Sequence, residues 1–123
     1  DRAVQLAQEP QADDLKNIAA FGGGWVAEET MAIAVYCSLR HVDDFSAALA
    51  AAVNHDGDSD STGAVTGNIL GAWLGFDAIE GRWKNGLELY DVLMELADDL
   101  CTAQQLPPDT PLSPEWIEKY ARS

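Results

Sequence analysis

Residues 54–75 read NHDGDSDSTGAVTGNILGAWLG, an acidic turn followed by an apolar segment in which glycine recurs every four residues. Positions four apart lie on one face of an α-helix, so the spacing predicts a helix from about Ser61 to Gly75. A glycine in a helix interior costs about 1 kcal/mol relative to alanine, so these glycines need a packing reason. We expect the glycine face to let another backbone approach closely, as in helix pairs that meet at small residues. The glycines are Gly63, Gly67, Gly71 and Gly75.

The rest of the chain also favours helices. Alanine is abundant, and no segment alternates apolar and polar residues for long enough to indicate a strand. We therefore predict an all-α fold. Further helices are predicted over residues 3–20 with a break at Pro10, over 26–41 after Gly22-Gly23-Gly24, over 45–53 after an Asp43 or Asp44 cap, and over 87–101 after a capping box of Asn85 and Glu88.

Length and proline content set the expected domain organisation. The chain has 123 residues, of which 47% are apolar, and this suits one helical domain, or part of a larger one, over residues 1–123. Residues 102–123 are expected to form a proline-rich tail with a short helix opened by Ser113-Pro114-Glu115. The prolines of this tail are Pro107, Pro108, Pro111 and Pro114.

Charge and cysteine content exclude several classes of partner and setting. Asp and Glu number 21 against 7 Lys and Arg, a net charge of −14, so direct binding to nucleic acid or anionic lipid is not expected. The longest nearly uncharged stretch, residues 61–76, is shorter than the roughly 20 residues that span a bilayer. Cys37 and Cys101 lie in apolar segments without metal-ligand spacing, so we predict buried free thiols and a reducing, cytoplasmic setting.

The acidic turn, residues 56–62, concentrates hard oxygen ligands directly before the predicted helix. Asp, Ser and Thr oxygens suit Mg²⁺, Mn²⁺ or Ca²⁺. A simpler interpretation is that Asp58, Ser59 and Asp60 cap the helix by accepting hydrogen bonds from its free N–H groups. From the residues alone both interpretations stay open. An EF-hand loop is excluded, because its sixth place would hold Ser61 where glycine is needed.

Two other motifs are weak matches. Asp58, Asp60 and Thr62 fit the D-x-D-x-T pattern of haloacid-dehalogenase-type phosphatases, but an Ala-rich helix precedes them where that family has a buried strand. Residues 22–27, GGGWVA, fit G-x-G-x-x-A, but a dinucleotide-binding fold needs a strand before these glycines. We interpret residues 22–27 as the stop of one helix and the start of the next.

A resemblance to a known family extends the analysis of the acidic turn. Residues 54–64, NHDGDSDSTGA, followed by residues 67–72, GNILGA, resemble the C-terminal metal motif of the ADP-ribosylglycohydrolases. Residues 24–29, GWVAEE, and residues 93–100 are also similar to that family, so the likeness covers about Gly22 to Leu100. It implies an orthogonal bundle of helices, of which this chain would be the C-terminal part.

The resemblance also implies a function and a metal centre. Members of the family remove ADP-ribose from a modified acceptor at a binuclear Mg²⁺ or Mn²⁺ centre. Position by position, Asp58 and Asp60 would be carboxylate ligands, and Ser61 would stand where many members have a threonine ligand. The expected partner is then an ADP-ribosylated substrate.

One part of the family's pattern is missing from this chain. Members carry a Thr-Asp-Asp motif with further metal ligands in an N-terminal half, and the sequence has no Thr-Asp-Asp. Two or three oxygens from one turn cannot complete an octahedral ion. We therefore expect an N-terminal half or a partner chain to complete the site, and little catalysis by this polypeptide alone. The alternative is a non-catalytic helical module that keeps the scaffold and binds partners.

Two kinds of side chain are left outside the predicted site. His55 directly precedes the acidic turn, and we expect its imidazole to bind no metal. The tryptophans could stack on an adenine, but we expect them to pack in the core or at helix ends. They are Trp25, Trp73, Trp83 and Trp116.

Overall fold

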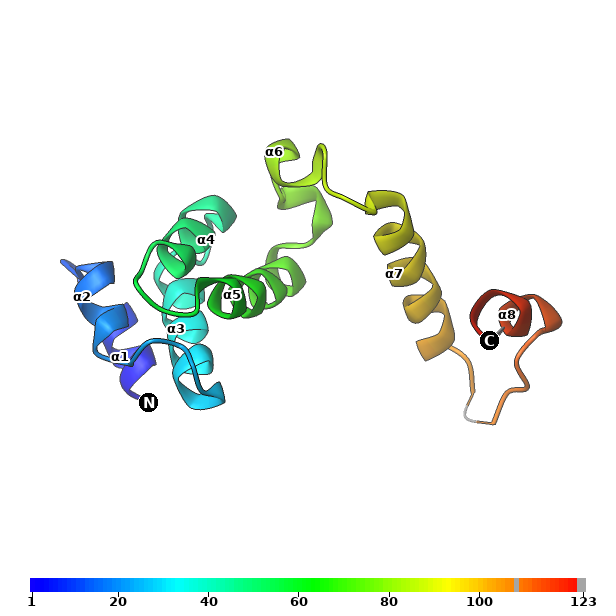
Figure 1. The fold of residues 1–123 in the computed structure, drawn as a ribbon, viewed down its shortest axis with the longest axis horizontal. Coiled ribbons are helices and arrows are strands. Elements are labelled where there is room, and N and C mark those ends of the chain that lie inside the picture. The colour runs from blue at the N-terminus through cyan, green and yellow to red at the C-terminus, as the bar shows by residue number, and fades with distance from the viewer. Residues whose placement is uncertain (108, 122–123) are drawn as a thin grey trace. The chain divides into compact units, whose positions relative to one another are not determined.

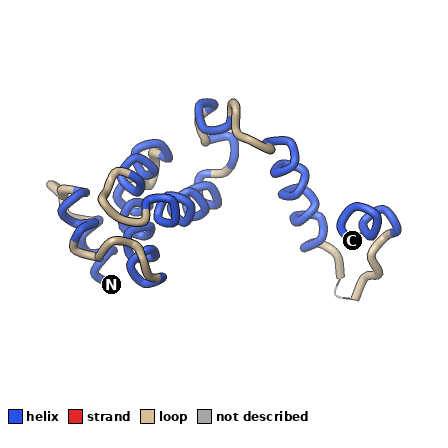
Figure 2. The backbone as a smooth tube through the Cα atoms, viewed as in Figure 1, coloured by secondary structure: helices blue, strands red, loops and turns tan. Residues whose placement is uncertain are grey.

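The computed structural model describes residues 1–107 and 109–121, and within these ranges it contains helices and loops but no strand (Figures 1 and 2). The predicted all-α fold is therefore confirmed. Of the predicted tail, Pro108 and residues 122–123 lie outside the described residues. In chain order the elements are α1 (Arg2–Ala7), α2 (Asp14–Ala19), α3 (Ala27–Arg40), α4 (Phe45–Val53), α5 (Ser59–Leu74), the 3₁₀ turn η1 (Phe76–Ala78), α6 (Gly81–Lys84), α7 (Tyr90–Gln104) and α8 (Pro114–Tyr120).

Two of the helices start at an aspartate cap, and the sequence predicts the one at α4. The helix predicted over residues 3–20 is broken around Pro10, and its second part, α2, begins after Asp13, whose carboxylate accepts from the Lys16 N–H at 3.2 Å. At α4 the second of the two candidate caps is used: the Asp44 carboxylate accepts from the Ala47 N–H at 2.8 Å. Each cap satisfies an amide that has no partner within the helix.

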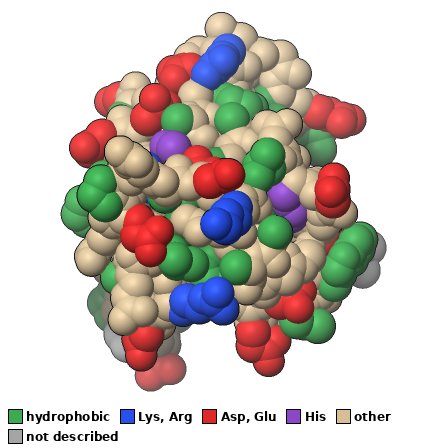
Figure 3. Space-filling model, turned by 90° about the vertical axis from the view of Figure 1, so that its left-hand side faces the viewer, with side chains coloured by type: hydrophobic (Ala, Val, Ile, Leu, Met, Phe, Trp, Pro, Cys, Tyr) green, Lys and Arg blue, Asp and Glu red, His purple; other side chains and the backbone are tan. Residues whose placement is uncertain are grey.

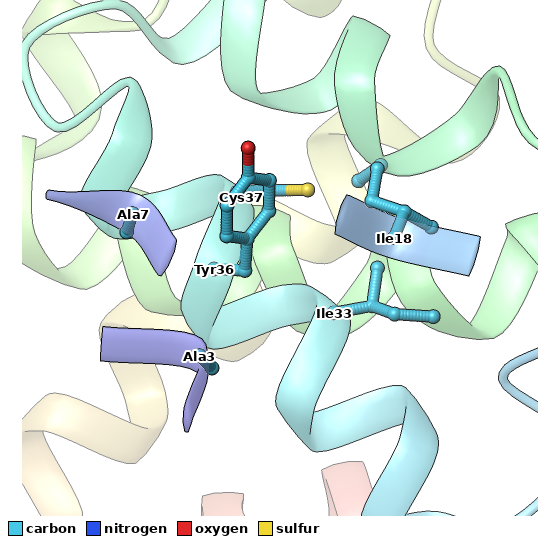
Figure 4. Close-up of a cluster of buried hydrophobic side chains, with 7 residues drawn as sticks. Ala3, Ala7, Ile18, Ile33, Tyr36 and Cys37 are labelled. Atoms are coloured by element: carbon cyan, nitrogen blue, oxygen red, sulfur yellow. The ribbon is translucent and has the colours of Figure 1, made fainter. Parts of the chain in front are cut away.

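The chain divides into two compact units, Asp1–Asn85 and Gly86–Ser123. In the first unit α3 is the central helix, because α1, α2, α4 and α5 all pack against it. Figure 4 shows Tyr36 and Cys37 on α3 among side chains of α1 and α2. The two buried clusters of this unit comprise Ala3, Ala7, Ile18, Ile33, Tyr36, Cys37 and Ala52, and Phe45, Ala48 and Leu70.

The glycine face of α5 is packed at one position. A Cβ added to Gly63 would lie 2.6 Å from Val53 Cγ1 at the end of α4, so this glycine is required by a close contact. A Cβ at Gly67 or Gly71 would meet its nearest neighbour at 3.6 or 3.9 Å, which is ordinary van der Waals contact, and nothing lies within 4 Å of a Cβ at Gly75. The expectation of a close backbone approach is therefore wrong at all four glycines, because the neighbours within 4 Å of Gly63, Gly67 and Gly71 are side-chain atoms and Gly75 has none.

The segment between α5 and α7 differs from the prediction. The sequence predicts a capping box of Asn85 and Glu88, but Asn85 ends α6 instead, and α7 begins at Tyr90 after Leu89 with a left-handed φ of 58°. The capping box is wrong because the backbone turns at Gly86, where φ is 82°, before the helix can start.

The tryptophans divide into packed and exposed ones. Trp83 donates its indole N–H to the Ser46 hydroxyl at 2.6 Å, and the Trp116 ring lies 5.2 Å from that of Tyr120, so both pack as expected. Trp25 and Trp73 are 74% and 70% exposed, and the expectation of core or helix-end packing is wrong for them. Trp73 instead borders an apolar groove of about 430 Å³ on the surface between α3 and α5.

In the second unit, α7 and α8 are joined by exposed polar contacts. Lys119 on α8 forms ion pairs with Glu95 and Asp99 on α7, and the Tyr120 hydroxyl donates to the Asp99 carboxylate. No described residue of this unit is buried. The predicted helix start at Ser113 is confirmed, since its hydroxyl accepts from the Trp116 N–H.

The cysteines lie one in each unit, and both are free thiols. Cys37 is buried on α3, as predicted, and burial raises the pKa of its thiol to about 12. Cys101 is exposed on α7, so the prediction of a buried thiol is wrong there. It lies in an apolar periodic segment, but among the described residues of its unit none buries its side chain.

Candidate metal centre

The acidic turn connects α4 to α5 and lies against the glycines that precede α3. The Asp58 N–H donates to the Gly23 carbonyl at 2.7 Å. A Cβ added to Gly57 would lie 1.9 Å from the Gly23 carbonyl oxygen, so only glycine fits there. Gly24 has a φ of 77° and approaches Thr62 on α5, where an added Cβ would lie 2.9 Å from its methyl group. Glycines on both sides therefore bring the turn into backbone contact with residues 22–24.

The glycine segment is itself fixed by α3. The Glu29 carboxylate accepts from the Gly24 N–H at 3.0 Å and from the Trp25 N–H at 3.3 Å. The Thr30 hydroxyl donates to the Gly24 carbonyl at 2.7 Å. Thus residues 22–27 end one helical segment and begin the next, as predicted, and the polar residues of the first turn of α3 hold the shape in which Gly23 meets Asp58.

The helix α5 begins at Ser59, two residues earlier than predicted, and this places Asp60 and Ser61 in its first turn. Asp58 stands at the N-cap position, but its side chain makes no capping hydrogen bond. Asp13 and Asp44, in the same position of α2 and α4, both do. Asp58 is therefore held less directly by the amides of its helix than Asp13 and Asp44 are by theirs.

The Asp58 carboxylate is directed toward its neighbours along the chain. The Asp60 carboxyl group and then the Ser61 hydroxyl lower the pKa of Asp58, because both stabilise its ionised form by hydrogen bonding; the Ser61 N–H contributes less. Two carboxyl groups and a hydroxyl therefore converge at the start of α5. Two carboxylates this close repel each other when both are ionised, and a divalent cation relieves that repulsion.

The candidate ligands are of the chemical type that a hard divalent cation prefers, but there are too few of them to complete its coordination. Asp58, Asp60 and Ser61 offer oxygen ligands, which Mg²⁺ and Mn²⁺ prefer. An octahedral ion takes about six ligands. In the described part of the chain no group of three or more Asp, Glu, His or Cys side chains is gathered for a metal ion. Further ligands would have to come from water, substrate or another polypeptide segment.

A cavity of about 410 Å³ adjoins the turn. Its apolar wall comes from α2, with Leu15, Ile18 and Ala19, and its polar wall from the turn and the glycine segment. Asp56 lines this cavity and lies outside the group formed by Asp58, Asp60 and Ser61. The cavity therefore adjoins the turn at Asp56 and Gly57, and Asp58, Asp60 and Ser61 are not among its lining residues. Figure 3 shows one side of the molecule, on which acidic side chains are scattered between apolar and neutral atoms.

His55, directly before the acidic turn, and Thr62, at its end, have roles that the sequence does not reveal. His55 Nε2 lies 3.0 Å from Thr62 Oγ1, and its Nδ1 accepts from the Gly57 N–H at 3.0 Å. Thr62 is fully buried, and its hydroxyl donates to the Ala52 carbonyl at 2.7 Å. The available signal was a threonine among small apolar residues at the start of a helix, which is where a hydroxyl is often used to bond the backbone.

Comparison with known proteins identifies one family. The model of the family described as ADP-ribosylglycohydrolase matches residues 1–110 and so covers most of the chain, including α1 and α2. No curated protein and no solved structure gives a match. None of the described helices is both long enough and apolar enough to cross a membrane.

Proposed function

The chain belongs to the ADP-ribosylglycohydrolase family, and we propose that it takes part in the hydrolysis of ADP-ribosyl linkages, with Asp58, Asp60 and Ser61 as ligands of a binuclear Mg²⁺ or Mn²⁺ centre. The family implies a hydrolase of this type and a general dependence on metal ions. The observation that carries the assignment to this turn is the gathering of the Asp58 and Asp60 carboxyl groups with the Ser61 hydroxyl at the start of α5.

This chain's own residues would supply one side of the centre. The Gly23 carbonyl holds the Asp58 N–H, and the first turn of α5 fixes Asp60 and Ser61. The two carboxylates would bind the cations, and the Ser61 hydroxyl would add a neutral oxygen. Ions held there would supply Lewis-acid chemistry, by which ribose hydroxyls would be bound and the pKa of a nucleophilic water lowered.

The remaining ligands would come from outside the described turn. We propose that an N-terminal half or a partner chain with a Thr-Asp-Asp motif completes the octahedral sites, and that the substrate is an ADP-ribosylated acceptor. Both cysteines are free thiols, which supports a reducing, cytoplasmic setting. The excess of acidic residues argues against direct partners among nucleic acids and membranes.

The metal assignment can be tested on the 123-residue chain by NMR. Mn²⁺ is paramagnetic and broadens the amide signals near its site, so binding at about millimolar affinity is enough. We expect the signals of Asp58, Asp60 and Ser61 to broaden first, and we expect Asp58→Asn and Asp60→Asn to abolish this. Asp56→Asn removes an equal charge from the same turn and is the matched control. Equal broadening in Asp60→Asn and wild type would contradict the assignment.

The reaction is tested separately, by release of ADP-ribose from an ADP-ribosylated protein. We expect release only when a family N-terminal half bearing Thr-Asp-Asp is added to the chain, and loss of release with Asp58→Asn or Asp60→Asn. Release by the 123-residue chain alone would show that no second segment is needed. If the chain binds Mn²⁺ but no ADP-ribose is released with or without the N-terminal half, the alternative of a non-catalytic helical module is supported. The D-x-D-x-T phosphatase would instead release phosphate from a phosphorylated substrate.

A further inference from the structure

The His55 imidazole bridges two parts of the acidic turn, its backbone at Gly57 and its end at Thr62. It contacts the Gly57 backbone through Nδ1 and the Thr62 hydroxyl through Nε2, each at 3.0 Å. We propose that His55 is a positioning residue: a neutral imidazole with its hydrogen on Nε2 that fixes the Gly57-Asp58 backbone and thereby aims the Asp58 carboxylate. The expected effect of His55 on metal affinity rests on the proposed function. The tautomer of His55 and its hydrogen bond to the Gly57 backbone do not.

The hydrogen-bond partners determine the protonation of the ring. A backbone N–H can only donate, so the Nδ1 atom that faces the Gly57 N–H must accept and carries no hydrogen. A neutral imidazole then has its hydrogen on Nε2 and donates it toward Thr62 Oγ1. A ring with its hydrogen on Nδ1 would place two donors face to face at Gly57.

Thr62 completes the network in a way that agrees with this tautomer. Its hydroxyl has one hydrogen, and the nearest acceptor is the Ala52 carbonyl at 2.7 Å, at the last turn of α4. The Thr62 oxygen is then free to accept from His55. Since Thr62 is fully buried, loss of its hydrogen bond with His55 would cost free energy, because water does not readily reach the hydroxyl to replace that bond. His55 therefore links the end of α4, the turn and the first turn of α5.

The consequence for Asp58 follows from two successive amides. The Gly57 N–H is held by His55, and the next N–H, that of Asp58, is held by the Gly23 carbonyl at 2.7 Å. With both amide directions fixed, the backbone around Asp58 has little freedom. The side chain of Asp58 leaves this backbone toward Asp60 and Ser61. Groups that orient metal ligands from behind in this way typically change metal affinity by about ten- to a hundredfold when they are removed.

The tautomer can be read directly from ¹⁵N NMR of the imidazole rings at pH 8. The chain has only two histidines, His55 and His41, so the signals are assigned by one substitution. We expect a bare Nδ1 and a protonated Nε2 for His55. A hydrogen on Nδ1 would overturn the proposal.

Substitutions at His55 test the positioning role. His55→Asn keeps an acceptor for the Gly57 N–H, because an asparagine side chain reaches the amide two residues on. His55→Ala removes it. We expect amide exchange at Gly57 to become about tenfold faster or more in His55→Ala and to stay near the wild-type rate in His55→Asn. The Mn²⁺ concentration that broadens the Asp58 signal should rise about tenfold in His55→Ala only.

The other histidine provides the control. His41 lies at the end of α3 and bonds the Asp14 carboxylate at 2.8 Å, away from the turn. His41→Ala should change neither Gly57 exchange nor the Mn²⁺ response. Unchanged Gly57 exchange in His55→Ala would overturn the proposal whatever the metal does. If Mn²⁺ leaves the wild-type turn unaffected, the proposed metal centre fails, while the tautomer and the exchange rates still decide the role of His55.

Discussion

The two units of the chain are both helical, yet they are stabilised in different ways. In residues 1–85 the central helix α3 buries Ile33, Tyr36 and Cys37 completely. In the described part of residues 86–123 no side chain is buried, although α7 carries a regular apolar stripe that includes Leu93, Leu96 and Leu100. The comparison teaches that amphipathic periodicity predicts a helix in both units, whereas a buried face also needs neighbouring helices to cover it.

The largest expected difference between the units is in thiol reactivity. Only the thiolate reacts with an alkylating agent. With a pKa of about 12, Cys37 is about one part in 10⁴ thiolate at pH 8 and is shielded as well. We expect iodoacetamide to modify the exposed Cys101 at least about a thousandfold faster, as followed by mass spectrometry of tryptic peptides. Equal rates in the native chain would mean that α3 is not buried in solution. Reaction of Cys37 should appear once urea unfolds the first unit.

The next largest difference is the cost of truncating an apolar side chain. Ile33→Ala removes a fully buried side chain and should lower the free energy of unfolding by about 2–5 kcal/mol. Leu100→Ala acts on a side chain that is 69% exposed and should change it by less than about 0.5 kcal/mol. Urea midpoints followed by circular dichroism measure both. A cost at Leu100 as large as that at Ile33 would show that α7 is covered in solution.

Within the first unit, the glycines of α5 separate a packed position from an open one. Gly63→Leu must displace Val53 and should destabilise the unit by about 1–3 kcal/mol or more. Gly71→Ala adds a methyl group with 3.9 Å to its nearest neighbour and should raise stability by up to about 1 kcal/mol, through helix propensity. Melting temperatures of the two variants test this. A lower melting temperature for Gly71→Ala would mean that another backbone approaches the glycine face after all.

The smallest effect concerns the polar contacts between α7 and α8. The hydrogen bonds from Lys119 and Tyr120 lower the pKa of Asp99. The stabilisation is therefore complete above the ordinary carboxyl pKa of about 3.9 and is lost as the pH falls through the lowered value. We expect the Tyr120 ring signals to shift only below about pH 4, and Lys119→Gln should move the midpoint upward. An unchanged midpoint in that variant would show that Lys119 is not paired with Asp99 in solution.

Local signals in the sequence were sufficient for most helices. The Asp44 cap, the break at Pro10 and the start after Ser113 each depend on a residue and its neighbours within one turn. The start of α7 was missed because Gly86 adopts a positive φ, so that Asn85 and Glu88 lie on opposite sides of a backbone turn. No pattern of side chains distinguishes that turn from a capping box.

In the candidate site, too, contacts within one helical turn are predictable from the sequence, whereas contacts between helices are not. Asp58, Asp60 and Ser61 lie within one helical turn, so their convergence follows from the sequence once the helix is placed. The contact of Gly23 with Asp58 and that of His55 with Thr62 depend on how three helices pack. Sequence alone could not predict those contacts, because the distances between these residues are set by the way the helices pack.

The hydrogen bond between the Asp58 N–H and the Gly23 carbonyl has a consequence for folding. It joins two loops that are separated by the whole of α3 and α4, so its loop-closure entropy is paid only after both helices have packed. We therefore expect the acidic turn to acquire its native shape late in the folding of the first unit and to lose it early in a partial opening. A chaperone or protease that captures such an opened state would meet intact helices with a disassembled turn, and a bound cation would shift the balance toward the closed state by mass action.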